Sequence, residues 1–329
     1  MPATIQAISY YLPPSALSTE KLSELFPEWS VEKIDAKIGI KNRYTTDENT
    51  FASDLAVAAA QKLFEEHAIN PAEIDFVLLC TQSPDYFLPT TACIIQDKLN
   101  IPTTAGALDF NLGCSGYVYG LGLAKGLVET QQATNVLLLT AETYTKFIHP
   151  QDKSVRTIFG DAAAATLITH TDGGNMQAFC YGTDGKGAPN LIVKNGGLRH
   201  PFTENRHGSP APTDDNLYMN GSEIFIFTLN AVPKLVAQTL AKAQLTLDEI
   251  DLIILHQANS FMLESLRKKI QINPEKFFVF MENCGNTVSS TIPIALAEAI
   301  KQGKATKGNK ILLAGFGVGY SWGATIVTL

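Results

Sequence analysis

Short apolar runs alternate along the chain with longer alanine-rich or amphipathic stretches. The runs 76–79 and 252–255 consist of Phe, Val, Leu and Ile, and each leads into polar residues. This pattern predicts buried β-strands. The alanine-containing stretches before them, around 60–63 and 237–240, predict helices. Helices that alternate with continuous apolar strands predict an α/β fold whose sheets are covered on both faces.

The same pattern occurs twice. Segment 60–82 (a helix, a polar turn and a strand that begins Glu-Ile-Asp) matches segment 237–257, and 113–115 (Gly-Cys-Ser) matches 285–287 (Gly-Asn-Thr). The run Asn-Val-Leu-Leu-Leu at 135–139 likewise has a partner at 309–313. We therefore predict two pseudo-symmetric halves from an internal duplication, an N-terminal half at 1–172 and a C-terminal half at 173–329.

Composition narrows the class of protein. A chain of 329 residues with 45% hydrophobic and 17% charged residues is typical of a globular protein larger than one core usually supports. The net charge of −7 argues against a nucleic-acid binder. Five cysteines without framework or metal-ligand spacing predict a reducing compartment and no metal site. We see neither a signal peptide nor an apolar run near the roughly 20 residues of a membrane span, and expect a soluble, cytoplasmic protein.

Three polar residues are candidates for a catalytic role. Cys114 follows a strand-like run that breaks at Gly113, and a small-residue helix begins after it. Backbone N–H groups and the dipole of a helix N-terminus favour the thiolate, which is the nucleophilic form. His256 ends the strand 252–255, and Asn286 mirrors Cys114 in the repeat. Each alone is compatible with a structural role, but the ends of parallel strands share one edge, so together they predict a catalytic cleft.

The glycine run 315–323 superficially resembles a phosphate loop. It lacks the Gly-Lys-Ser/Thr ending and leads into a strand, which excludes that interpretation. Because glycine has no Cβ, the run predicts a close approach of the backbone to a ligand.

The motifs taken in order resemble the β-ketoacyl-acyl-carrier-protein synthase III family of the thiolase superfamily. They are the segments 37–43, 113–116, 159–161, 219–221, 256–259, 285–287 and 316–323. The resemblance covers essentially the whole chain. It implies a thiolase-like, five-layer αβαβα fold and a homodimer with a Cys114–His256–Asn286 triad. It also implies a transferase that needs neither metal nor cofactor, with coenzyme A thioesters as substrates.

The resemblance also implies a reaction. An acyl-CoA would acylate Cys114, with the backbone N–H groups of Cys114 and Val318 as the oxyanion hole. A malonyl thioester on acyl carrier protein would then lose carbon dioxide, its enolate held by His256 and Asn286. Attack on the acyl-cysteine would give 3-oxoacyl-carrier protein, for fatty acid or related specialised metabolite biosynthesis.

Further binding residues follow from the resemblance alone. They are Lys37, Lys153, Gly221, Asn259 and Phe316 for coenzyme A, Leu88 (reaching into the partner's pocket) and Met219 for the acyl chain, and Arg267, Lys268 and Lys269 for the carrier protein. The chain also departs from the family. Lysine replaces arginine at 37 and 153, Phe261 and Ile226 stand where a basic residue is common, and Trp29 lies several residues before the expected adenine-stacking tryptophan.

Other proteins of this fold need different residues. A thiolase would need a second cysteine in 315–323, and a hydroxymethylglutaryl-CoA synthase would need an acid near Gln82; the sequence has neither. A non-catalytic partner subunit would not need Cys114. An acyltransferase of the same fold, which moves the acyl group to an alcohol or amine without condensation, remains the alternative.

Overall fold

The computed structural model describes residues 2–171, 175–202 and 209–329. The predicted boundary between the halves at 172/173 lies outside the described residues. The strands are β1 (Ala3–Tyr11), β2 (Ser15–Ser18), β3 (Asn42–Thr45), β4 (Phe76–Cys80), β5 (Gly106–Phe110), β6 (Asn135–Glu142), β7 (Ala162–His170), β8 (Asn175–Thr183), β9 (Leu191–Ile192), β10 (Tyr218–Met219), β11 (Leu252–Leu255), β12 (Lys310–Gly317) and β13 (Ser321–Thr328). The α-helices are α1 (Thr19–Leu25), α2 (Val31–Ile38), α3 (Ala52–His67), α4 (Thr91–Lys98), α5 (Gly116–Glu129), α6 (Lys153–Arg156), α7 (Gly221–Ala243), α8 (Ser260–Ile270) and α9 (Thr291–Lys301).

Two sheets with matching strand orders form the framework. The first has the order β1-β7-β6-β4-β5, in which β4 is parallel to β5 and β6 while β7 is antiparallel to β6. The second has the order β11-β12-β13-β8, with β11 parallel to β12. A parallel bridge between Ile253 and Phe277 lies where the first sheet has β5. Each predicted half therefore supplies one sheet, and the repeat seen in the sequence is a repeat of strand order.

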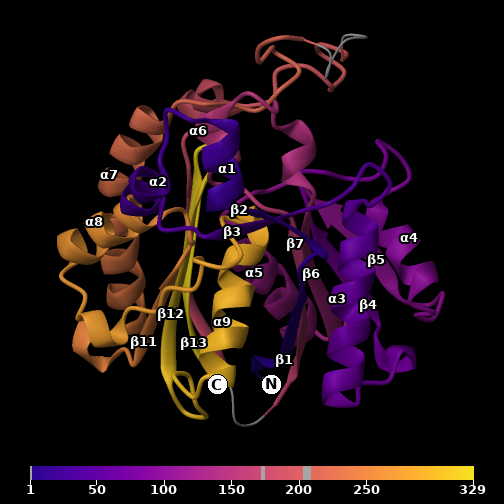
Figure 1. Ribbon diagram of the computed structural model, residues 1–329. Helices are drawn as coiled ribbons and strands as arrows, with labels where there is room; N and C mark the ends of the chain where they lie inside the picture. The colour runs from indigo at the N-terminus through magenta and orange to yellow at the C-terminus, as the bar shows by residue number, and fades with distance from the viewer. Residues whose placement is uncertain (1, 172–174, 203–208) are drawn as a thin grey trace.

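Helices and sheets stack in five layers (Figure 1). The central layer is α5 and α9, whose apolar residues, such as Leu121 and Leu296, pack between the sheets. Helices α3 and α4 cover the outer face of the first sheet, and α7 and α8 cover that of the second. The strands are thus buried on both faces, which is why they read as continuous apolar runs. The predicted five-layer α/β fold is confirmed.

One pair of helices crosses between the halves. Helices α1 and α2 come from the N-terminal half, yet Leu22 and Ile34 join the core cluster of α8, with Leu266. Ser18 and Ser30 cap these two helices by accepting hydrogen bonds from backbone N–H groups. The segment between them, which contains Trp29, is therefore held over the C-terminal half.

Helix α7 has the length and composition of a membrane span, with 28% of its most apolar window buried. Thr228, Asn230 and Lys234 interrupt its apolar residues, so the sequence contains no continuous apolar run of that length here. In the fold α7 packs against β8, β12 and β13 and contributes Val232, Leu235 and Val236 to the core. The helix thus serves as the outer layer of the second sheet.

Candidate active site

Cys114 lies between the end of β5 and the first turn of α5. Ser115 is the N-cap of α5, and Cys114 is 5% exposed. A Cβ at Gly317 would lie 2.9 Å from Cys114 Sγ, and one at Gly315 would lie 2.6 Å from the Cys114 carbonyl oxygen. The glycine run therefore makes a close approach to Cys114, and its residue Gly317 also lines the cavity beside Cys114. Strand β12 can pass beside Cys114 only because these positions lack side chains.

His256 and Asn286 face the same cavity. His256 follows β11 directly, and its ring packs edge-on against Phe316 with 5.5 Å between ring centres. Asn286 Nδ2 lies 3.5 Å from His256 Nε2, while Asn286 Oδ1 accepts a hydrogen bond from the backbone N–H of Val288 (2.9 Å). With its oxygen occupied in this way, the Asn286 amide presents its NH₂ group to the cavity.

A cavity of about 160 Å³ joins these residues. Cys114, His256 and Asn286 line it together with the predicted binding residues Met219, Gly221, Asn259 and Phe316. Residues for which the sequence predicted no role in the site complete it, among them Phe159, Leu191 and Ile224. A second, more open space of about 450 Å³ shares Gly221, Asn259 and Met262 with it. We call this second space the mouth of the site.

Burial and the backbone N–H groups at the helix N-terminus have opposite effects on the pKa of Cys114. Burial, and secondarily the nearby Glu142, raise the pKa of the Cys114 thiol to about 12, although the backbone N–H groups of Cys114 and Val318 act in the opposite direction. The backbone N–H groups at the helix N-terminus thus favour the thiolate, as predicted, but burial outweighs them. A partial charge at the helix end does not offset the removal of a sulfur anion from water.

The raised pKa predicts how the reactivity of Cys114 depends on pH. Only the thiolate reacts, so below its pKa the alkylation rate of Cys114 by iodoacetamide should rise about tenfold per pH unit from pH 6 to 8. The rise should become shallower above pH 8, where Glu142 ionises. Peptide-resolved mass spectrometry measures it, with the exposed Cys93 as an internal comparison. A rate that is already constant at pH 7 would contradict the raised pKa.

His256 is held as a neutral imidazole. Burial lowers its pKa to about 3, so one ring nitrogen carries a proton at neutral pH and the other does not. Nδ1 lies 2.7 Å from Thr291 Oγ1, and that hydroxyl also lies 3.1 Å from the Val288 carbonyl. The hydroxyl has one proton, so it donates either to the Val288 carbonyl, which leaves Nδ1 as the protonated nitrogen, or to Nδ1, in which case Nε2 carries the proton and points a donor into the cavity. Thr291, which the sequence did not identify, thus sets the tautomer.

A buried carboxyl group, Glu142 at the end of β6, links two loops of the site. Its Oε2 accepts hydrogen bonds from the backbone N–H of Gln82 (3.1 Å) and the Ser83 hydroxyl (3.3 Å), and its Oε1 accepts from the Ser289 hydroxyl (2.9 Å). Burial nevertheless raises the pKa of Glu142 to about 8. At neutral pH the group is mostly a protonated acid that joins the Gln82 loop to the segment after Asn286.

Glu142→Gln should therefore stabilise the protein at neutral pH. The pKa of the Glu142 carboxyl is near its ordinary value of 4.5 in the unfolded chain and about 8 in the folded protein, so its stabilising effect is complete below pH 4.5 and is lost as pH rises to 8. By pH 7 this loss amounts to roughly 3 kcal/mol, from 1.36 kcal/mol per pH unit. Glutamine has the shape of the protonated acid and does not ionise. Urea unfolding of both proteins at pH 5, 6, 7 and 8 should show a stability difference that grows with pH; parallel curves would contradict it.

Several predicted residues lie outside the lining of the cavity. Lys153 Nζ forms an ion pair with Glu28 (2.7 Å) and lies 5.7 Å from the centre of the Trp29 ring. The helix pair α1–α2 thus brings Trp29 to the predicted coenzyme A residue, which its sequence position did not suggest. Lys37 is exposed in the last turn of α2.

The three basic residues predicted for carrier-protein docking differ from one another. Glu264 binds both Arg267 (2.7 Å) and Lys268 (3.3 Å), and Arg267 also donates to the Ile272 carbonyl. Lys269 is exposed and has no ion pair among the described residues. Leu88 is 82% exposed and lies away from the cavity of its own chain.

Comparison with known proteins agrees with this geometry. Residues 108–185 match the family model of 3-oxoacyl-[acyl-carrier-protein] synthase III, and residues 240–329 match that of its C-terminal part. A β-ketoacyl-[acyl-carrier-protein] synthase III from Clostridium perfringens is 37% identical over 97% of both chains, and one from Clostridioides difficile is 36% identical over 99% of this chain and 98% of the relative.

Solved structures of this name share the whole fold. A 3-oxoacyl-(acyl-carrier-protein) synthase III superposes with a TM-score of 0.97 at 51% identity, covering 100% of both chains. The synthase III from Thermus thermophilus gives a TM-score of 0.89 at 31% identity, covering 99% of both. The predicted resemblance and enzyme class are confirmed. With its thiolase-like layers and full-length similarity, this chain belongs to the β-ketoacyl-acyl-carrier-protein synthase III family of condensing acyltransferases.

Proposed function

We propose that this protein transfers an acyl group from acyl-CoA to Cys114 and condenses it with malonyl-acyl carrier protein to give 3-oxoacyl-carrier protein. The observation that carries the proposal is the convergence of Cys114, His256 and Asn286 on one cavity. A nucleophile and two side-chain donors are what acyl transfer followed by enolate formation requires.

Acylation comes first. The Cys114 sulfur attacks the thioester carbonyl, its proton leaves, and the negative charge on the carbonyl oxygen is held by the N–H groups of Cys114 and Val318. The backbone bonds from these two groups to the sulfur, which lower the thiol pKa, support this assignment because they show both N–H groups within reach of it. Collapse of the intermediate expels the coenzyme A thiolate, which takes up the proton.

Condensation follows in the same cavity. The malonyl thioester carbonyl accepts hydrogen bonds from His256 Nε2–H and Asn286 Nδ2–H. The electron pair that remains on the α-carbon when carbon dioxide leaves is therefore stabilised as an enolate. The enolate carbon attacks the acyl-cysteine carbonyl and the Cys114 thiolate leaves. A neutral His256 suits this step, because it donates a hydrogen bond without needing to ionise.

The coenzyme A site is proposed to run from the mouth to α2 and α6. Gly221 and Asn259 border the passage, and Lys153 with Trp29 would hold the adenine nucleotide at its outer end. The Glu28–Lys153 ion pair must open or shift for Lys153 to meet a phosphate. Lysine keeps the charge here but lacks the planar stacking of arginine.

The carrier protein is proposed to dock beside the mouth. The surface there is apolar, since Phe261 (60% exposed) stacks on Phe225 and Ile226 is 53% exposed. Of the three predicted docking residues, Lys269 has the charge least engaged within the chain. Apolar contacts should therefore contribute more to the affinity for the carrier protein than electrostatic attraction does.

A homodimer is proposed on two features of the exposed surface. Strand β5 is an edge strand with one neighbour in the described sheet, and Leu108 on it is exposed. The adjoining loop exposes Tyr86, Phe87 and Leu88 in sequence. Exposed edges and contiguous apolar side chains are usually covered by a partner.

The five cysteines are free thiols, which suits the reducing cytoplasm that we propose as the location of the enzyme.

Leu88 should limit the length of the primer from across the dimer. Leucine leaves more room than phenylalanine, so the wild type should accept primers longer than acetyl, and Leu88→Phe should shift preference toward acetyl. Each buried methylene contributes about 0.8 kcal/mol, or about fourfold per carbon. Acylation rates across C2 to C12 acyl-CoAs test this. Since Leu88 is exposed in the single chain, a folding defect is not expected. If the wild type prefers acetyl-CoA and Leu88→Phe has the same preference, Leu88 does not limit the length of the primer.

Reconstitution separates the proposed function from its alternative. The reaction mixture contains the enzyme, malonyl-carrier protein, and acetyl-CoA or a longer acyl-CoA. It should release carbon dioxide and form 3-oxoacyl-carrier protein in equal amounts. An acyltransferase without condensation would leave malonyl-carrier protein intact and form an ester or amide when alcohols or amines are added. Acyl-Cys114 without either product would contradict both.

A further inference from the structure

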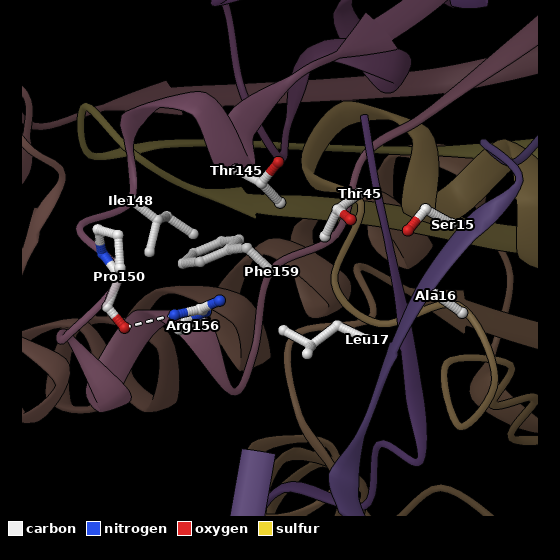
Figure 2. A pocket seen from close by; sticks show the side chains of 9 residues that line it. All are labelled: Ser15, Ala16, Leu17, Thr45, Thr145, Ile148, Pro150, Arg156 and Phe159. Atoms are coloured by element: carbon white, nitrogen blue, oxygen red, sulfur yellow. Dashed lines mark hydrogen bonds between the residues drawn. The ribbon is translucent and has the colours of Figure 1, made fainter. Parts of the chain in front are cut away.

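A second cavity lies behind the wall of the active site. It has a volume of about 290 Å³ and is lined by residues of β2, β3 and the segment 145–159 (Figure 2). This volume is near the lower end of small-molecule sites, which run from roughly 300 to 1,000 Å³. We call it the side cavity. None of the residues assigned to the proposed reaction lines it.

An unpaired cation faces the side cavity. Arg156 donates to the Pro150 carbonyl (2.5 Å), and no carboxylate of the described residues forms an ion pair with it. The guanidinium is half-buried, and burial lowers the Arg156 pKa. Arginine carries five N–H donors, so most of them are left for another acceptor. A half-buried charge without a counter-ion is costly, which favours an anion as the missing partner.

Hydroxyl and apolar groups complete the lining. Ser15 and Thr45 are directly opposed across β2 and β3, and neither hydroxyl has a hydrogen-bond partner among the described residues. Thr145 also lines the cavity, but its hydroxyl donates to Asp161. Leu17 and Phe159 form apolar walls (Figure 2). The lining therefore suits a molecule with an oxyanion at one end and a short apolar part at the other.

Phe159 connects the side cavity to the catalytic cavity, since its side chain lines both. Its backbone pairs with that of Asn286 as a parallel bridge. On either side of it, the Asn286 N–H donates to the Ile158 carbonyl (3.0 Å) and the Gly160 N–H donates to the Asn286 carbonyl (3.0 Å). A molecule that packs on Phe159 therefore contacts a residue that forms the wall of the acyl cavity and that is bonded through its neighbours to the backbone of Asn286.

We propose that the side cavity binds a small organic anion, a carboxylate or phosphate monoester with a short apolar tail, and that its occupancy alters acylation of Cys114 through Phe159. The oxyanion accepts hydrogen bonds from Arg156 at one end of the cavity, and the tail packs on Leu17 and Phe159 toward the Ser15 and Thr45 hydroxyls at the other end (Figure 2). Arginine binds both carboxylates and phosphates through two parallel hydrogen bonds, so the two anions share one recognition chemistry.

Titration calorimetry with hexanoate, hexyl phosphate and inorganic phosphate tests binding to the full-length protein. Arg156→Gln should weaken binding of the organic anions at least tenfold, because charged hydrogen bonds are lost. Arg156→Lys should retain most of it. The matched control Arg199→Gln, at an exposed arginine, should change nothing. Hexanol, which lacks the charge, should bind the wild type no better than it binds Arg156→Gln.

Crystals grown with 6-bromohexanoate locate the ligand, since the anomalous signal of bromine distinguishes the side cavity from the acyl cavity. Saturating hexanoate should also change the rate of Cys114 acylation in the wild type and not in Arg156→Gln. Any of three results would overturn the proposal: binding that is unaffected by Arg156→Gln, bromine that is found only beside Cys114, or no binding at millimolar concentration. Normal Cys114 acylation in Arg156→Gln would show that the proposed function stands independently of this outcome.

Discussion

Cys114→Ala should abolish acyl transfer. Without the sulfur no covalent intermediate can form, and the oxyanion hole of Cys114 and Val318 has no tetrahedral centre to stabilise. Loss of a catalytic nucleophile costs on the order of 10⁴-fold or more in rate. Intact-mass spectrometry after incubation with acyl-CoA should show one acyl group on the wild type and none on the variant.

The control for this experiment is Cys93→Ala, which removes an exposed thiol away from the catalytic cavity. It should accept an acyl group at the wild-type rate. Stoichiometric acylation of Cys114→Ala would assign the nucleophile to another residue and contradict the proposed mechanism.

His256→Ala and Asn286→Ala should separate the two half-reactions. Each variant removes one donor to the enolate, so condensation should fall by about 10²- to 10³-fold, the usual effect of deleting one such donor. Acylation of Cys114 should continue in both, because the sulfur has no hydrogen bond from either side chain among the described residues. Carbon dioxide release from malonyl-carrier protein measures the first step and intact mass the second.

A matched control is His67→Ala, at an exposed histidine at the end of α3, which should change neither step. If Asn286→Ala condensed at the wild-type rate, Asn286 would have no part in enolate stabilisation. If His256→Ala lost acylation as well, the imidazole would act as the base that deprotonates Cys114, a role that the raised pKa of that thiol makes chemically reasonable.

Local sequence patterns were sufficient for the fold class and the three central residues. Apolar periodicity and the position of a polar residue after an apolar strand are local properties, so β4 and β11 and the residues after them could be placed from the sequence. The repeat then related Asn286 to Cys114. The five layers followed from the family resemblance and agree with the structure (Figure 1), whereas the strand order came from the structure alone.

Tertiary contacts decided what the sequence could not. Trp29 reaches Lys153 because α1 and α2 pack on the other half of the chain, a long-range event that its spacing from Lys37 does not encode. Glu142 and Thr291 appeared as ordinary strand and helix residues, and only folding places them at the loops of the site.

The sequence by itself determined which residues are proposed to carry the chemistry, namely Cys114, His256 and Asn286, because their positions after strands and before helices follow from local sequence patterns. Only the tertiary structure decided their protonation. Burial from several distant segments raises the pKa of Cys114 and lowers that of His256. A pKa depends on how much water surrounds a group, and that is set by every chain segment packed around it.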